Sequence, residues 1–234
     1  VHLGPPAATV APPTTINNST TFGDGADIIT ASKGTDNIRL GEGAGAAIVS
    51  GERNIGIGKD AATANTTGSR NVAIGHQSLL ANTVGSRSVA IGHNSLSAQN
   101  PASATNMFNT AVGHEAGAAI TTGTLNSFVG GLAGDANTTG TANNAFGYDG
   151  LGANTTGGEN NAFGRNALGA NTTANGNSAF GHRALQANTT GSSNVGIGHS
   201  ALTSNTTAPR NTAVGYQSLT ANTTGDNNTA IGER

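Results

Sequence analysis

Histidine recurs along this chain at intervals that would stack imidazole rings on one another if the chain wound into regular coils. The regularly spaced histidines form two groups, with His76, His93 and His114 in the first and His182 and His199 in the second. Stacked imidazoles can ligate transition metals such as zinc and copper. The same place in other copies of the surrounding pattern holds Lys59, Gly131, Tyr148, Arg165 and Tyr216. Because a continuous metal column does not tolerate such residues, we predict a surface or turn role for the histidines and no metal or cofactor site.

Two aspartates near the start of the chain point to calcium as a second candidate chemistry. Asp27 lies in GDGADII at 23–29 and Asp36 in GTDNI at 34–38, nine residues apart. This spacing is a faint echo of the nonapeptide repeats of calcium-binding β-rolls, with only two degenerate copies. We therefore predict that residues 23–36 form a strand region that caps the repeats, with calcium at Asp27 and Asp36 as the alternative.

Asn-Thr-Thr triplets recur regularly and match the acceptor pattern for N-glycosylation. Their asparagines are Asn65, Asn137, Asn154, Asn171, Asn188, Asn205 and Asn222. Their regularity follows from a repeat in the sequence. The triplets also stack pairs of threonines, and threonine arrays on flat solenoids are one way to bind ice. Adjacent residues of a strand point to opposite faces, so each pair supplies one outward hydroxyl column, and ice binding is an alternative function.

Composition argues against several classes of function. The chain of 234 residues has no cysteine, and its twelve acidic residues are scattered. Nucleophilic triads and acid–base carboxylate pairs need unlike residues that converge on one pocket, so we predict that the chain is not an enzyme. The formal charge of −2 argues against nucleic acid, which requires a basic footprint. Apolar runs such as AGAAIV at 44–49 are too short to cross a bilayer.

A repeat of seventeen residues must position any of these side chains. The element N-x-A-(I/V/F)-G begins at twelve places, and ten of the eleven intervals between them have this length. The copies begin at Asn37, Asn54, Asn71, Ser88, Asn109, Asn126, Asn143, Asn160, Asn177, Asn194, Asn211 and Asn228. The one longer interval, from Ser88 to Asn109, has four extra residues and contains SAQNPASATNMF at 97–108, where Pro101 suits a bulged loop. A disordered chain needs no such register, so each copy is predicted to lie on the next.

A repeat of this length is too short for two packed helices and long enough for one turn of a narrow β-solenoid. Numbering each copy from its Asn as position 1, we predict one strand over positions 2–5 and a second strand centred on position 9. β-branched or aromatic residues fill position 4, from Ile57 to Ile231, and leucine often fills position 9, as in Leu79 and Leu168. These two columns are predicted to face each other and form the core. The predicted fold class is all-β, a parallel β-solenoid of about twelve coils.

Small residues and asparagines fit the same arrangement. Alanine or glycine fills nearly every position 3, with Phe128 as the one large apolar intruder, so we predict close approach there by the chain itself or by a partner. Asparagine at positions 1 and 12, as in Asn211 and Asn222, is predicted to turn corners with a left-handed backbone. Stacked about 4.8 Å apart, such asparagines would form amide ladders along a rod on the order of 55 Å long.

The residues of the repeat resemble a known family. The runs NVAIG (71–75), SVAIG (88–92) and NTAIG (228–232) are similar to the head repeats of YadA-like trimeric autotransporter adhesins. The longer pattern N-T-A-V-G-Y-Q-S-L-x-A-N-T-T-G resembles repeats in bacteriophage tail fibres and related tail-fibre-domain proteins. The resemblance covers residues 37–232. It implies a left-handed parallel β-roll, three chains side by side on a threefold axis, extracellular or virion display, and a binding role.

These observations divide the chain into three parts. Residues 1–22, rich in Pro, Thr and Ala, are predicted to be an extended linker or docking segment, 23–36 the capping strand region, and 37–234 the solenoid. We expect the solenoid to continue beyond residue 234 in the native polypeptide, or another subunit to cover this end.

The predicted function is structural, as the shaft or head of a phage tail fibre or of a cell-surface trimeric adhesin that displays a host-binding or surface-binding region. One alternative is a self-assembling extracellular filament whose N-terminal segment docks on the next subunit, and the other is the ice-binding solenoid. The expected partners are further copies of the chain, as a homotrimer or an end-to-end polymer, and a cell-surface receptor or glycan. Neither nucleic acid nor membrane insertion is expected.

Overall fold

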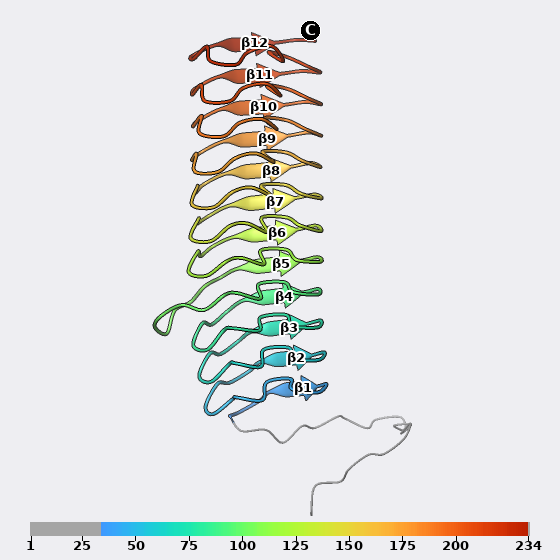
Figure 1. Cartoon of the computed structure of the whole chain (residues 1–234), viewed down its shortest axis with the longest axis vertical. Helices are drawn as coiled ribbons and strands as arrows, with labels where there is room; N and C mark the ends of the chain where they lie inside the picture. Colours follow the sequence, from blue (N-terminus) through green and yellow to red (C-terminus); the bar gives the residue numbers. More distant parts are fainter. Residues whose placement is uncertain (1–33, 234) are drawn as a thin grey trace, which may run out of the picture.

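Each copy of the repeat forms one coil, and the coils stack along one axis into a rod (Figure 1). The computed structural model describes residues 34–233, so the predicted linker and most of the predicted capping region lie outside it. One parallel sheet of twelve strands runs along the rod in the order β1 to β12. The strands are β1 Ile38–Leu40, β2 Ile55–Ile57, β3 Val72–Ile74, β4 Val89–Ile91, β5 Thr110–Val112, β6 Ser127–Val129, β7 Asn144–Phe146, β8 Asn161–Phe163, β9 Ser178–Phe180, β10 Val195–Ile197, β11 Thr212–Val214 and β12 Thr229–Ile231. The predicted all-β parallel solenoid is confirmed.

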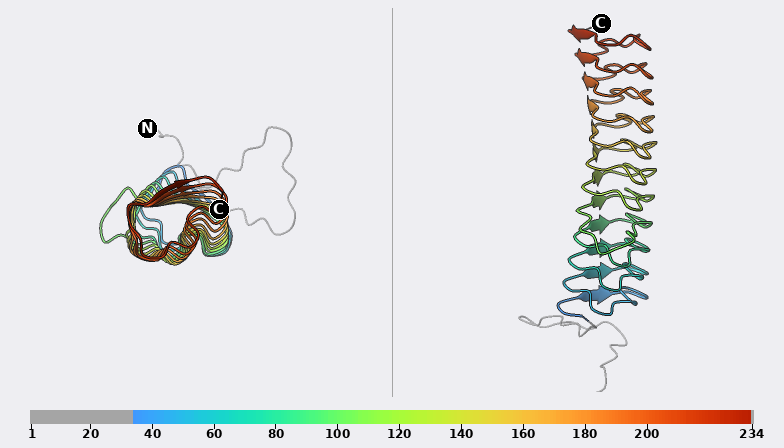
Figure 2. Two further views of the ribbon diagram at one scale, coloured as in Figure 1. Left: turned by 90° about the horizontal axis from the view of Figure 1, so that it is seen from above. Right: turned by 90° about the vertical axis from the view of Figure 1, so that its left-hand side faces the viewer.

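Every strand pairs with its neighbour in the same register, so equivalent positions of the repeat lie above one another. Ile74 pairs with Ile91, and Ile91 pairs with Val112 across the one longer interval. The extra residues leave the stack as a loop between β4 and β5, which projects from the rod (Figure 1, Figure 2). The tip of this loop is exposed, while Met107 at its return is fully buried. The loop predicted at 97–108 is therefore confirmed.

The interior is filled by different side chains from those that the sequence pattern predicts. Position 3 points inward: Ala73, Ala162 and most other residues there are completely buried with the position-9 leucines. Position 4 points outward, and Phe146 keeps 40% of its surface exposed. Successive residues of a strand face opposite sides, so placing one column inside places the other outside. The predicted pairing of positions 4 and 9 was wrong because the interior is narrow enough for alanine to fill it opposite leucine. The close approach predicted at position 3 is made by the chain itself.

No second strand forms in the coils between residues 34 and 233, where positions 6–11 are a series of tight turns. Positions 7 and 9 have a left-handed backbone in every complete coil, and the leucines at position 9 have φ angles between 49° and 54°. Such angles are uncommon for residues with large side chains. They are tolerated because these turns pair with neighbouring coils: the N–H of Leu79 donates to the carbonyl of Ser95 at 2.9 Å. The turns thereby replace the hydrogen bonds of the predicted second strand. The described part of the chain also holds no helix that could span a bilayer.

The repeated asparagines form the predicted amide ladders, although not with the predicted backbone. In the described coils position 17 has a left-handed backbone, as positions 7 and 9 do, whereas the asparagines at positions 1 and 12 have no positive φ. At position 12, Nδ2 of Asn154 donates to Oδ1 of Asn137 at 2.7 Å and to the carbonyl of Gly157 at 3.0 Å. At position 1, the backbone N–H of Asn160 donates to Oδ1 of Asn143 at 3.0 Å. All four asparagines are completely buried, so both ladders link the coils inside the rod.

Inside the rod, a larger residue at position 3 is accommodated by smaller residues at position 9. Phe128 is the one large apolar residue at position 3, and position 9 of its own coil and of the preceding coil is Gly134 and Gly117 instead of leucine. A methyl group at Gly134 would lie 2.5 Å from the ring of Phe128, and one at Gly117 would lie 3.1 Å from it. The aromatic ring therefore occupies the volume that leucines fill elsewhere.

Candidate functional site

The outer face of the sheet runs along the whole described rod. It consists of the side chains at positions 2 and 4 of β1 to β12, and we call it the strand face. Position 4 is leucine, isoleucine, valine or phenylalanine in every strand, and neither position carries a charged residue in any of the twelve strands. Phe180 and Ile197 are 41% and 40% exposed. An uncharged and largely apolar stripe therefore runs along the described rod.

Aromatic rings are concentrated in one section of the strand face. The rings of Phe146, Phe163 and Phe180 stack with centroids 4.8 and 4.9 Å apart. In these three strands position 2 is asparagine or serine, whereas β2, β3, β4 and β10 combine valine or isoleucine at position 2 with isoleucine at position 4. In this section the larger ring thus accompanies the more polar neighbour, whereas β5, β6 and β11 combine threonine or serine at position 2 with valine at position 4.

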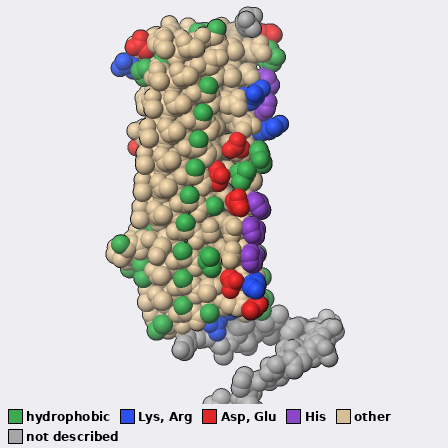
Figure 3. Space-filling model, viewed as in Figure 1, with side chains coloured by type: hydrophobic (Ala, Val, Ile, Leu, Met, Phe, Trp, Pro, Cys, Tyr) green, Lys and Arg blue, Asp and Glu red, His purple; other side chains and the backbone are tan. Residues whose placement is uncertain are grey.

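Position 6 follows the strand at a corner of the coil, and its residues form one column. Position 5 is always glycine, because a methyl group at Gly75 would lie 2.5 Å from the carbonyl oxygen of Gly92 and φ there is 130°. The histidines of the described residues lie in this column, in two groups along one edge of the rod (Figure 3). The rings of His76, His93 and His114 stack at centroid distances of 5.2 and 5.0 Å. The predicted placement of the histidines in a surface turn is confirmed.

The second histidine group has cationic neighbours. Nδ1 of His182 lies 3.2 Å from Nε2 of His199. Desolvation lowers the pKa of His182, and the charges of His199, Arg165 and Arg183 lower it further. His182 is therefore held in its neutral form at a lower pH than an isolated histidine. The first group differs because a carboxylate, that of Glu115, adjoins it.

Of the two aspartates considered for calcium, Asp27 lies outside the described residues. Asp36 occupies the left-handed corner at position 17, with a φ of 60°. Its Oδ2 lies 3.7 Å from Nε of Arg53 in the next coil, and both side chains are more than half exposed. Such an exposed ion pair contributes little to stability.

The Asn-Thr-Thr triplets form another corner of the coil. Their asparagines belong to the position-12 ladder, and all except Asn222 are completely buried. A buried amide nitrogen that donates two hydrogen bonds is not accessible to glycosylation in the folded rod. The first threonine of a triplet bonds to the next coil, as when the hydroxyl of Thr155 donates to the carbonyl of Thr172 at 3.1 Å. The second threonine, such as Thr156, is exposed, so the triplets present one outward hydroxyl row, as predicted.

Two carboxylates lie close together beside Gly152. A methyl group there would contact Oδ1 of Asp149 and lie 3.5 Å from Oδ1 of Asp135. Oδ1 of Asp135 is buried without a hydrogen-bond donor. Desolvation raises the pKa of Asp135, and the charge of Asp149 raises it further. Desolvation also raises the pKa of Asp149, opposed by a hydrogen bond from Asn166. This acidic pair is therefore a local source of instability when both groups are ionised.

Sequence reasoning located the columns of the repeat but missed the strand face and the carboxylate beside the first histidine group. The uncharged positions 2 and 4 were a signal for the strand face, although position 4 was assigned to the core. No family model matches the chain, and no curated protein or solved structure is significantly similar to it. The geometry of the rod is therefore the main ground for assigning a function.

Proposed function

We propose that this chain is the structural shaft or head of an extracellular or virion fibre, in which three copies associate side by side through their strand faces. The observation that supports this proposal most directly is the strand face, which presents apolar side chains and no charge over twelve strands. Extended apolar stripes are rare on monomeric soluble proteins and mark interaction sites. A second and a third copy of the same rod cover the stripe along its whole length.

The strand face is long and narrow. Twelve strands about 4.8 Å apart and three residues wide make a face of roughly 500 Å². A stable interface usually buries about 800 Å² on each partner. The position-17 corner, which precedes the strand, adds large exposed apolar side chains only at Phe108 and Leu125, which are 48% and 54% exposed. Elsewhere this corner holds exposed charged residues such as Arg70 and Glu159. The strand face is therefore smaller than a standard interface, and we propose that residues flanking it also take part in the association.

In the proposed assembly the copies are parallel and in register, so that each coil of one copy meets the same coil of the next. Three copies around a common axis turn their strand faces inward, which agrees with the trimer that the resemblance to adhesin and tail-fibre repeats implies. The loop between β4 and β5 is the candidate contact for a receptor or glycan, because it interrupts the otherwise repeated surface of the described residues.

Light scattering behind size exclusion tests the proposal on the wild-type chain and two lysine variants. The wild type is expected to have three times the mass of one chain, which is 22.8 kDa. Phe163→Lys places a charge in the strand face and is expected to yield single chains, because burial of an unpaired charge is strongly unfavourable. Thr156→Lys places the same charge on the exposed threonine row and is expected to leave the trimer intact. Circular dichroism verifies that both variants are folded.

A wild-type mass of one chain, or equal effects of the two substitutions, would overturn the trimer. An open-ended polymer that persists in Phe163→Lys would instead support the filament, in which copies join end to end.

A further inference from the structure

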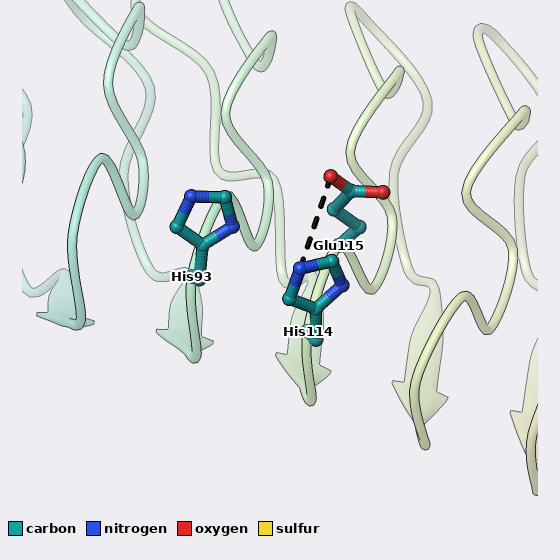
Figure 4. Close-up of side chains that lie close together, drawn as sticks. All are labelled: His93, His114 and Glu115. Atoms are coloured by element: carbon teal, nitrogen blue, oxygen red, sulfur yellow. Dashed lines mark ion pairs between the residues drawn. The ribbon is translucent and has the colours of Figure 1, made fainter.

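The first histidine group brings three potential metal ligands together on two neighbouring coils. His93 and His114 occupy position 6 of consecutive coils, and Glu115 occupies position 7 of the second coil. One ligand atom of each residue lies within 4.8 Å of those of the other two, and Nε2 of His114 is 4.0 Å from Oε1 of Glu115 (Figure 4). The two imidazole rings are nearly parallel, with 15° between their planes. The three side chains therefore meet at one place on the edge of the rod.

We propose that His93, His114 and Glu115 bind a divalent transition metal ion such as Zn²⁺, at a site that is separate from the strand face. Two imidazole nitrogens and one carboxylate oxygen are a ligand set that zinc accepts, with bonds of about 2.0–2.2 Å. Ligands at that bond length in tetrahedral geometry are about 3.4 Å apart, so each ligand atom has to move by less than about 1 Å.

The side chains are free to make this adjustment. The side chain of His114 is 61% exposed and that of Glu115 is 37% exposed, and His93 is also exposed. The nitrogen lone pairs of imidazole lie in the ring plane, so both rings must also turn out of their stacked orientation to face one ion. Rotation about side-chain torsions provides this movement without a change in the backbone. Water molecules complete the coordination on the open side, as in zinc sites that have three protein ligands.

Charge also favours a cation at this place. With neutral imidazoles the three ligands carry the single negative charge of Glu115. A second carboxylate, Asp135, is close enough for the charge of Glu115 to contribute to its raised pKa. Position 7 beside the other two members of the group is neutral, as Gln77 and Asn94. The local charge is thus negative before the metal binds.

The second histidine group provides a matched control in the same column. His182 and His199 are also on neighbouring coils, but position 7 beside them holds Arg183 and Ser200. The positive charge of Arg183 opposes a metal cation, and no carboxylate joins these two histidines in a three-ligand cluster within residues 34–233. Metal binding is therefore expected at one histidine group and not at the other. A metal site with ligands from only two coils does not require histidine at position 6 of every coil, which the sequence lacks.

Zinc titration by calorimetry tests the proposal on the full chain without a histidine tag. The background carries His2→Ala, because His2 is the remaining histidine and lies outside the described residues. One zinc ion per chain is expected in this background. Glu115→Gln and His93→Ala are each expected to weaken binding at least tenfold, because even residues that only support ligands contribute about 10- to 100-fold to metal affinity. His182→Ala is expected to bind zinc as the background does.

Thermal unfolding gives a second readout, because a ligand that binds the folded state raises the unfolding temperature. Zinc is expected to raise it in the background and in His182→Ala but not in His93→Ala, and a chelator should reverse the increase. Position 6 holds Gly131 and Arg165 in other coils, so the variants are expected to fold. Undiminished zinc binding by Glu115→Gln and His93→Ala, an equal loss in His182→Ala, or no binding at millimolar zinc would overturn the proposal.

Discussion

Replacement of one ladder asparagine, in the variant Asn154→Ala, is expected to destabilise the coils around it by about 3 kcal/mol. Nδ2 of Asn154 donates to Oδ1 of Asn137 at 2.7 Å and to the carbonyl of Gly157 at 3.0 Å. Oδ1 of Asn154 accepts a hydrogen bond from Nδ2 of Asn171 at 2.8 Å. Each of these three buried hydrogen bonds contributes about 1 kcal/mol net, and the loss leaves Oδ1 of Asn137 without its donor.

Hydrogen exchange measures this loss where it occurs. A decrease of about 3 kcal/mol in the free energy of local opening accelerates exchange about 100-fold. The effect is expected at amides of the same and adjacent coils, such as Thr155, whose N–H donates to the carbonyl of Thr172 at 2.8 Å. Amides of distant coils, such as those of β2, are expected to keep their protection because each coil contacts only its neighbours.

Thr156→Ala is the matched control, two residues further along the same corner. Thr156 is exposed, and substitutions at such surface positions usually change stability by less than about 0.5 kcal/mol. Similar exchange rates in Asn154→Ala and Thr156→Ala would refute the reasoning that the buried amides link the coils.

Two further sets of variants test the interior and the acidic pair. Gly134→Leu alone is expected to destabilise the rod because its side chain would overlap the ring of Phe128, and Phe128→Ala alone creates a cavity that costs about 3–5 kcal/mol. The double variant restores the alanine and leucine of other coils and should recover most of the loss, so additive losses in urea denaturation would contradict this packing. Asp135→Asn is expected to raise the unfolding temperature near pH 7, because the raised pKa of Asp135 means that its ionised form destabilises the folded chain. The folded chain is more stable when the carboxyl of Asp135 is protonated. This stabilisation is present at low pH and is lost as the pH rises through the pKa of Asp135 in the folded chain. Wild type and variant should therefore converge below the ordinary aspartate pKa of about 3.9, and a difference that is independent of pH would rule out this cause.

The period of the repeat is sufficient to predict the stack, its register and its one projecting loop. Each of these features follows from similar copies lying on one another, and β4 pairs with β5 in register even across the longer interval. The amide ladders follow for the same reason, since Asn137, Asn154 and Asn171 recur at one position. The exposure of the histidines was predictable because the same position also accepts Lys59 and Arg165.

The pattern did not predict which side of the strand faces inward. Side chains alternate along the strand in the same way whichever side faces inward. Ile74 at position 4 is larger than Ala73 at position 3, so side-chain size favoured position 4 for the core, which was wrong. The width of the interior is decided by the turns at positions 7 to 9, where leucines such as Leu79 adopt a φ of 52° that residue propensities do not predict. Glu115 was missed beside His93 because the two residues meet only when a turn of one coil lies over that of another.

Oxidative cross-linking tests most directly whether copies of the chain meet through their strand faces, parallel and in register. The chain has no cysteine, so Phe163→Cys and Thr156→Cys each introduce a single thiol. Phe163 lies on β8, which meets β8 of another copy in a parallel association but β5 in an antiparallel one. We predict disulfide-linked dimers of chains for Phe163→Cys and none for Thr156→Cys under mild oxidation. Equal cross-linking of the two variants, or none at Phe163→Cys, would contradict this arrangement.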